Sequence, residues 1–290
     1  MQGRALYRYD ADESPSTYIT NYLVTAICVA AIVIHIAKPP TPQPATKAAV
    51  AYSRMPPSVV MAVHLGLFGV VFLIGGLGHH VWKHDKCPGV EMPSNTTVAC
   101  PSGRDNEPVI RTYLFFLGPC VAQLVPLGAA LSGLADRFSG AYMPIAIVSN
   151  VIGLALGILC AVVGHPGFFI LGGLMLFLYL LLSIAAAVGL CAAEGSKSAK
   201  LLVSSGSLCV VVGGVIQFVF TSSCGASAYA VDGASGCPFG GDGVNGVNHN
   251  FVYHVFEILS KIALAVSMRH LVAGKAIDVA CKAIDVTIGA

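Results

Sequence analysis

The chain has 290 residues, of which 56% are apolar and only 10% are charged, and its formal net charge is +2. A soluble protein of this size carries about 25% charged residues, so the composition excludes an ordinary soluble domain and indicates a polytopic membrane protein. The small net charge and the scattered basic residues argue against nucleic acid as a partner and leave membrane lipid as the expected surroundings.

Seven stretches are long and apolar enough to cross a bilayer, which takes about 20 such residues per helix. In chain order they are Tyr18–Ala37, Ser58–Trp82, Val109–Ala135, Ala141–Val163, Gly167–Ala193, Leu201–Ser222 and Phe251–Val272. The shortest joint, "GHPG" at 164–167, contains the Gly and Pro that are typical of a turn. We therefore predict an all-α fold, a seven-helix transmembrane bundle over residues 18–273, between an N-terminal segment 1–17 and a tail 274–290.

The loops carry an uneven charge that predicts the orientation. Seven spans place the termini on opposite sides, which we call side A for the N-terminus and side B for the C-terminus. Basic residues outnumber acidic ones on side B, whereas acidic residues prevail on side A. The positive-inside rule then predicts an outer N-terminus and a cytosolic C-terminus.

The two long loops of side A, 83–108 and 223–248, contain features of an extracellular or luminal environment. Each loop holds two cysteines; the four are Cys87, Cys100, Cys224 and Cys237. An oxidising compartment would join them, and of the three connectivities we favour the local pairs Cys87–Cys100 and Cys224–Cys237. Asn95 begins a glycosylation sequon in the first of these loops. Both features favour the plasma membrane or a membrane of the secretory pathway.

A polar stripe begins the seventh span, in the segment "NHNFVYHVFEILSK" at 248–261. On a helix, Asn250, His254, Glu257 and Lys261 follow at spacings that place them on one face. Glu257 and Lys261 are four residues apart and can pair. Lys261 lies roughly 15 Å from the helix start, near the middle of the bilayer, so the stripe must face the bundle interior or a watery cavity.

Histidines at the side A end of the second span are candidate partners for this stripe. His79 and His80 end that span and should lie level with His254. Together with Glu257 they form a candidate zinc site with an open coordination position. The alternative is that the histidines form interfacial hydrogen bonds, while Glu257 and Lys261 neutralise each other and hold helices in register. His64, deeper in the same span, is expected to be a core histidine or part of an inner cavity.

Three short patches resemble an uncharacterised, mainly bacterial, multi-pass membrane family. They are "TN" at 20–21, "GGLGH" at 75–79 and "NHNFVYH" at 248–254. Members of that family have T-D, GG-x-x-H and NHNDLFH at these places, so Asn21 and Phe251 depart from the pattern. The resemblance implies a multi-pass fold and brings no function with it.

A more distant likeness is to the seven-span superfamily of alkaline ceramidases and progestin/adipoQ receptors. His80 is similar to the zinc-binding histidine that ends the family's second span, and His254 to one of the HxxxH pair in its seventh. The resemblance implies a zinc-dependent hydrolase of lipid amides or esters, with Glu257 as the candidate base. This chain has Gly76 at the place of the family's serine, no Asp in its third span, and HxxxxH spacing. The family's sites also open toward the inner side, opposite to the orientation inferred here.

Lys261 also resembles the retinal-binding lysine of microbial rhodopsins, because it lies in the seventh span with an acid four residues earlier. Two features speak against a retinal protein. The chain has a single Trp, Trp82, at a span end, and its third span lacks the carboxylate that would serve as counterion. Retinal therefore ranks as a remote third interpretation.

The tail repeats KAIDV at 275–279 and 282–286, which aligns Ile277 and Ile284 on one helical face. It is either an amphipathic extension of the last helix or a frayed end. The tail and the Gly-rich stretch 233–246 are the expected contacts for a second copy of the chain or a neighbouring membrane protein.

The sequence lacks a phosphate-binding loop, a Ser-His-Asp pattern and a dinucleotide fingerprint. Our first hypothesis is a non-catalytic seven-span membrane protein, receptor-like, ligand-binding or scaffolding, with a His/Glu cluster near its outer face. The zinc-dependent hydrolase is the alternative, and the missing Ser and Asp weigh against it.

Overall fold

The computed structural model describes residues 15–37, 57–80, 107–132, 139–191, 197–224 and 249–288. These ranges hold the helices α1 (Pro15–Ala37), α3 (Pro57–His80), α4 (Glu107–Ala122), α5 (Leu124–Leu131), α7 (Ser139–Val163), α8 (His165–Cys191), α9 (Lys197–Cys224) and α10 (His249–Ile288). In the part of the chain so described, seven helical spans are long and apolar enough to cross a membrane. The prediction of an all-α protein with seven spans long and apolar enough to cross a membrane is confirmed for these ranges.

The third span is the one whose course differs from the prediction of a single continuous helix. It runs from Pro108 to Leu131 but is interrupted at Gln123, between α4 and α5. Pro126 explains the position of the break, because a proline ring clashes with the carbonyl four residues earlier, here that of Ala122. The backbone N–H of Gln123 instead donates to the Cys120 carbonyl at 3.3 Å, a tighter turn. Pro119 and Pro144 lie inside continuous helices.

The short joint at 164–167 is a genuine turn between two spans. α7 ends at Val163 and α8 begins at His165, with Gly164 between them at φ 76°, a conformation that favours glycine. The Gly164 N–H donates to the Cys160 carbonyl at 2.8 Å, which closes the last turn of α7. Space is also tight at Gly167, where an added Cβ would lie 2.6 Å from the same carbonyl oxygen.

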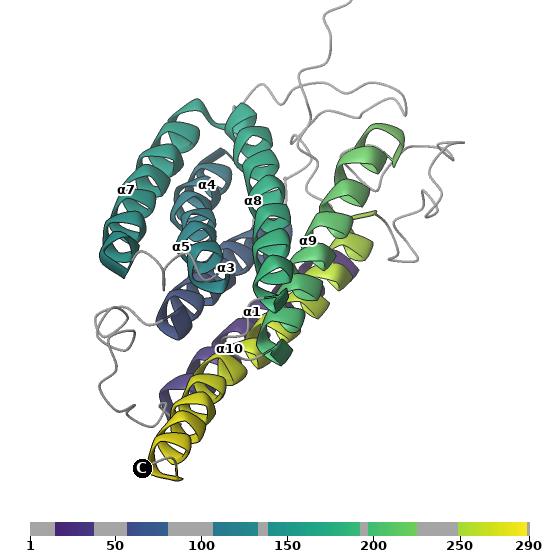
Figure 1. The fold of residues 1–290 in the computed structure, drawn as a ribbon. Coiled ribbons are helices and arrows are strands. Elements are labelled where there is room, and N and C mark those ends of the chain that lie inside the picture. The colour runs from purple at the N-terminus through teal and green to yellow at the C-terminus, as the bar shows by residue number, and fades with distance from the viewer. Residues whose placement is uncertain are drawn as a thin grey trace, which may run out of the picture.

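Spans that follow one another in the chain run in opposite directions and form one bundle (Figure 1). α1 packs along α3 and α10, α3 along α4, α8 along α9, and α9 along α10, while α7 packs mainly against α4. α1, α4, α8 and α10 begin at one end of the bundle, which we call end A. α3, α7 and α9 finish there, as the contact between Tyr22 and His80 and that between Gln217 and Asn250 show.

Glycine contacts bring α4 and α7 unusually close together. A Cβ on Gly118 would lie 2.3 Å from the backbone oxygen of Gly153 and 2.6 Å from Gly157. Small residues at these positions let the two backbones touch, which is how helices commonly associate in lipid. The packing holds α7 in place although much of its own surface is exposed and apolar.

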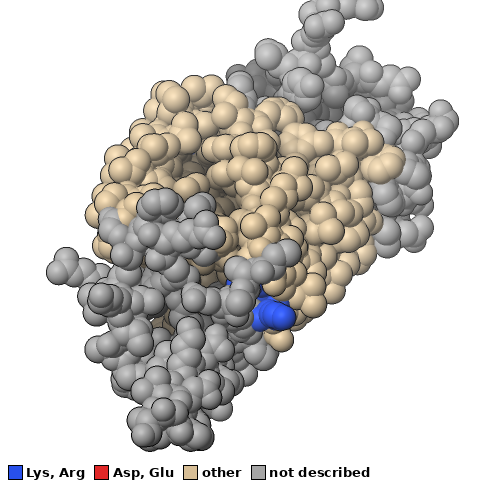
Figure 2. Space-filling model, in the orientation of Figure 1, with Lys and Arg blue, Asp and Glu red and all other residues tan. Residues whose placement is uncertain are grey.

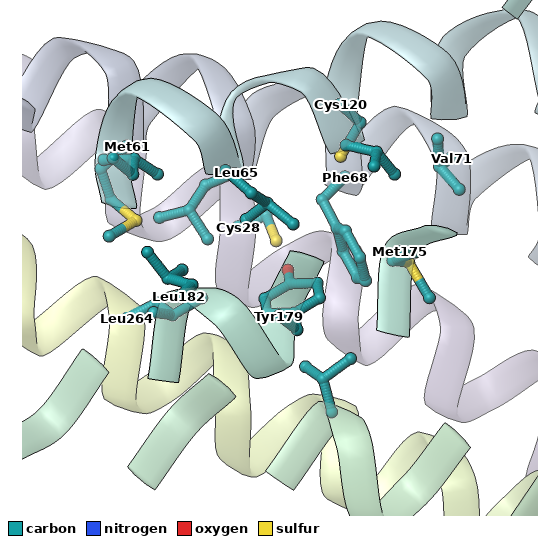
Figure 3. Packing of buried hydrophobic residues seen from close by; sticks show 14 of the residues in the cluster. Cys28, Met61, Leu65, Phe68, Val71, Cys120, Met175, Tyr179, Leu182 and Leu264 are labelled. Atoms are coloured by element: carbon teal, nitrogen blue, oxygen red, sulfur yellow. The ribbon is translucent and has the colours of Figure 1, made fainter. Parts of the chain in front are cut away.

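The surface and the core are both apolar, as expected for a bundle surrounded by lipid. On the face drawn in Figure 2, the described surface carries one small group of Lys or Arg atoms and no Asp or Glu. The core cluster draws on every described helix; its labelled members in Figure 3 are Cys28, Met61, Leu65, Phe68, Val71, Cys120, Met175, Tyr179, Leu182 and Leu264. Tyr179 points its hydroxyl into the middle of this cluster.

The last helix, α10, is longer than a bilayer is thick. α10 runs through both KAIDV copies to Ile288, whereas its apolar span covers only His249–Met268. At a rise of about 1.5 Å per residue, the helix extends well beyond a hydrocarbon core of about 30 Å. The sequence boundary between bundle and tail at 273–274 therefore falls inside one continuous helix.

Candidate functional site

The polar stripe of α10 faces the interior of the bundle. Asn250, His254, Glu257 and Lys261 are all buried, and both Glu257 and Lys261 are 0% exposed. Lys261 Nζ lies 3.0 Å from Glu257 Oε2, the pairing expected from their spacing. A fully buried ion pair inside a membrane bundle is unusual enough to mark a functional-site candidate.

The ammonium group of Lys261 is surrounded by groups that favour a cation. It lies 3.5 Å from the centroid of the Phe68 ring and 4.8 Å from that of Tyr179. It also donates a 2.8 Å hydrogen bond to the Tyr179 hydroxyl. Aromatic faces attract a desolvated cation by about 2 kcal/mol, so the pocket stabilises the charged form together with Glu257.

The hydrogen bonds continue from Tyr179 to a second buried base. The Tyr179 hydroxyl lies 2.7 Å from His64 Nε2, and His64 Nδ1 lies 2.9 Å from the Cys120 backbone oxygen. Both His64 and Tyr179 are almost fully buried. Glu257, Lys261, Tyr179 and His64 thus form one connected set, which we call the central network; it joins α10, α8, α3 and α4.

A backbone carbonyl fixes the direction of the hydrogen bonds in the central network. The Cys120 oxygen can only accept, so His64 Nδ1 carries a proton and donates to it. In the neutral imidazole Nε2 is then the acceptor, and the Tyr179 hydroxyl donates to it. The Tyr179 oxygen in turn accepts from Lys261. Every donor therefore points from Lys261 toward His64.

Glu257 retains capacity to accept a proton. Apart from the ion pair, neither of its carboxylate oxygens accepts a hydrogen bond of good geometry within the described residues. Tyr253, one turn earlier on α10, faces the same carboxylate. Cys28 on α1, Cys120 on α4 and Cys209 on α9 are also in electrostatic contact with the ion pair, as are His64 and Tyr179. Lys261 is the cation that faces this carboxylate, at 3.0 Å.

Polar contacts also lead from the central network toward end A. His254 Nδ1 lies 2.8 Å from the Thr20 hydroxyl, which also lies 2.9 Å from the Thr17 carbonyl. That carbonyl can only accept, so the Thr20 proton points to it and His254 donates from Nδ1. Asn250 accepts from the side-chain amide of Gln217 at the same end. The stripe is thus tied to α1 and α9 near the start of α10.

The zinc donors proposed from the sequence are separated wherever the structure describes them. His80 is exposed, its ring stacks on Tyr18 with centroids 4.4 Å apart, and its Nδ1 lies 3.2 Å from the Tyr22 hydroxyl. His254 instead packs against Phe72 and bonds to Thr20. Among the described residues, no three His, Cys, Asp or Glu side chains lie together as a metal site would need. The described donors do not fit zinc as a set, while the side chain of His79 lies outside the described residues.

The side A loops are not part of the described structure. Cys87, Asn95, Cys100 and Cys237 fall outside the described residues, so their disulfides and glycosylation stay predictions. Cys224 was expected in a loop but ends α9, and its side chain is likewise outside the described set. The cysteines that the structure does describe, Cys28, Cys120, Cys160 and Cys209, are free thiols.

Two members of the central network were missed or undervalued in the sequence. The sequence pattern predicts no role for Tyr179, and it predicts for His64 only a core position or a place in an inner cavity. A signal did exist for each: both are hydrogen-bonding side chains deep inside apolar spans, where such groups need partners. The comparisons add no relative that would assign them a role, because no family model, curated protein or solved structure matches this chain.

Proposed function

We propose that this protein is a non-catalytic, receptor-like integral membrane protein whose responding element is the central network. The observation that carries the proposal is the fully buried ion pair between Glu257 and Lys261, which bonds directly to Tyr179 and through it to His64. A change in the charge or position of either partner alters hydrogen bonds that join α10, α8, α3 and α4, so it affects the packing of all four helices. A buried network that several helices share can couple the binding of a ligand to the arrangement of those helices.

A stimulus would reach the network from end A. His254, Thr20, Asn250 and Gln217 supply hydrogen-bonding groups there, and Glu257 follows one turn below His254. The charge of the loops favours an outer location for this end. We infer that the ligand or ion is taken from outside the cell or from the lumen of a secretory compartment.

The zinc-dependent hydrolase remains a second candidate, on one observation. Thr20 accepts from Nδ1 of His254, and this tautomer leaves Nε2 as the atom that would ligate a metal. Against it, His80 is engaged by Tyr18 and Tyr22, and Glu257 is paired with Lys261. Metal analysis of the purified protein separates the two candidates. Stoichiometric zinc that is lost in His254→Ala would favour the hydrolase.

Hydrogen–deuterium exchange of the full chain in lipid nanodiscs tests the receptor-like proposal. The double variant Glu257→Gln with Lys261→Met removes both charges from the centre of the bundle. If the network couples the helices, amide exchange should change in α3, α4 and α8 as well as in α10. The matched control is Ser183→Ala with Ser204→Ala, which removes a hydroxyl pair 3.1 Å apart between α8 and α9. A change confined to α10 would contradict the proposal.

The proposed outer location of the N-terminus and of loop 83–108 can be tested separately. Glycosidase treatment of intact cells should shift the mass of the wild type but not of Asn95→Gln. A chain that carries no glycan, with loop 83–108 cleaved by protease only from the cytosolic side, would reverse the proposed topology.

A further inference from the structure

The central network is ordered by depth along the membrane normal. Counting about 1.5 Å per residue from end A, Glu257 lies roughly 12 Å deep, Lys261 about 18 Å, Tyr179 about 21 Å and His64 about 24 Å. Because every donor from Lys261 onward points toward His64, the hydrogen bonds run away from end A. The order of the residues by depth, which follows from helix geometry, agrees with the direction of the hydrogen bonds, which follows from the Cys120 carbonyl.

We propose that the central network is an inward proton relay, in which a proton taken up at Glu257 from the end A side drives a proton through Tyr179 to His64. This goes beyond the receptor-like role proposed above, which rests on the same side chains, because it assigns the site a specific stimulus and a specific acceptor. The stimulus is a proton from the aqueous phase at end A.

The first step is protonation of the Glu257 carboxylate. Glu257 is 0% exposed, so the proton must reach it along the polar face of α10, on which His254 lies one turn closer to end A. Once Glu257 is neutral, the Lys261 ammonium is a buried charge without a counter-charge. Loss of that counter-charge leaves the hydrogen bond to Tyr179 as the route by which the ammonium can release a proton.

The second step moves that proton without any movement of heavy atoms. An N–H bond of Lys261 breaks as an O–H bond forms on Tyr179, while the original O–H bond of Tyr179 breaks as an N–H bond forms on His64 Nε2. The products are a neutral Lys261 amine and a His64 imidazolium whose Nδ1–H still donates to the Cys120 carbonyl. That charge-assisted hydrogen bond stabilises the cation at its new position.

The third step resets the ion pair. Neutral Glu257 transfers its proton to the Lys261 amine 3.0 Å away, which restores a carboxylate and an ammonium. The net result is one proton that entered at Glu257 and one that resides on His64, three short contacts further from end A. Protons and charges balance, and no other reactant is required.

A pH-jump infrared experiment on the full chain in lipid nanodiscs tests the relay. Isotope-labelled histidine reports the imidazolium, and His64→Gln assigns the band to His64. In the wild type, acidification should protonate Glu257 and then charge His64. Tyr179→Phe keeps the ring but removes the hydroxyl, and should slow the charging of His64 by about 100-fold or more, the usual size of a lost proton-transfer group. Tyr142→Phe, at another fully buried tyrosine on α7, should keep the wild-type rate.

A second variant guards against a folding defect in Tyr179→Phe. Lys261→Arg keeps a cation opposite Glu257, but a guanidinium does not give up its proton in proteins. His64 should therefore stay neutral after the acid pulse in this variant. A wild-type His64 that never becomes charged, or one that is charged at the wild-type rate in Tyr179→Phe or Lys261→Arg, would overturn the relay. Normal relay kinetics without exchange coupling among the helices would instead overturn only the receptor-like role.

Discussion

Removing one charge of the central ion pair should destabilise the bundle far more than removing both. Lys261→Met leaves Glu257 as a lone buried carboxylate, and breaking a buried pair in this way costs about 3–5 kcal/mol. Glu257→Gln leaves the ammonium alone and should cost a similar amount. The double variant retains neither charge, so its remaining loss is the contact with Phe68 and the hydrogen bond to Tyr179, together about 2–3 kcal/mol. The two sites should therefore be strongly coupled, with a coupling free energy of about 3–8 kcal/mol.

The assay is reversible unfolding of the purified chain in bicelles by titration with a denaturing detergent, which gives the free energy of unfolding of each variant. The control cycle replaces Ser183 and Ser204, whose hydroxyls are 3.1 Å apart between α8 and α9. Hydrogen bonds of this kind between membrane helices contribute about 0.6 kcal/mol, so that cycle should show little coupling. Losses at Glu257 and Lys261 that simply add, with coupling below about 1 kcal/mol, would show that the two charges do not meet.

Three other expectations follow from the packing and can be checked by the same unfolding assay. Gly118→Ala should cost about 1–3 kcal/mol, because the new Cβ would lie 2.3 Å from the Gly153 oxygen. Gly173→Ala is its control, since nothing lies within 4 Å of the added carbon. This variant should be neutral or stabilise the helix by up to about 1 kcal/mol. Equal losses in both variants would contradict the α4–α7 contact. Thr20→Val should cost about 1 kcal/mol through the lost bond to His254, and an unchanged stability would place that histidine elsewhere.

The spans could be predicted from the sequence because each span is formed by a single continuous run of mostly apolar residues, whose length alone indicates that it can cross a bilayer. The "GHPG" turn was predictable for the same local reason, and Gly164 has the positive φ that such a turn uses. The spacing of Glu257 and Lys261 placed them on one helical face without any knowledge of the fold. The break at Gln123 does not follow from Pro126 alone, because whether a proline bends a helix or interrupts it depends on the packing of neighbouring helices.

The rest of the central network depends on contacts between helices, which a single sequence does not encode in any local pattern. His64 and Tyr179 are separated by 115 positions, and Tyr179 and Lys261 by 82. Nothing in the apolar runs of α3 and α8 indicates which face meets α10. His80 shows the converse error, because its place beside His254 was inferred from similar depth alone. In the structure it faces Tyr18 and Tyr22 on α1 instead.

The central claim is that the Lys261 ammonium is bonded to the Tyr179 hydroxyl in the middle of the bundle. Solid-state NMR of the full chain in lipid bilayers, with 15N at lysine Nζ and 13C at tyrosine Cζ, measures this contact directly through their dipolar coupling. We predict one strongly coupled Lys–Tyr signal, as the 2.8 Å hydrogen bond requires, that disappears in Tyr179→Phe and persists in Tyr142→Phe. A spectrum without such a signal, or with one that survives Tyr179→Phe, would contradict the account.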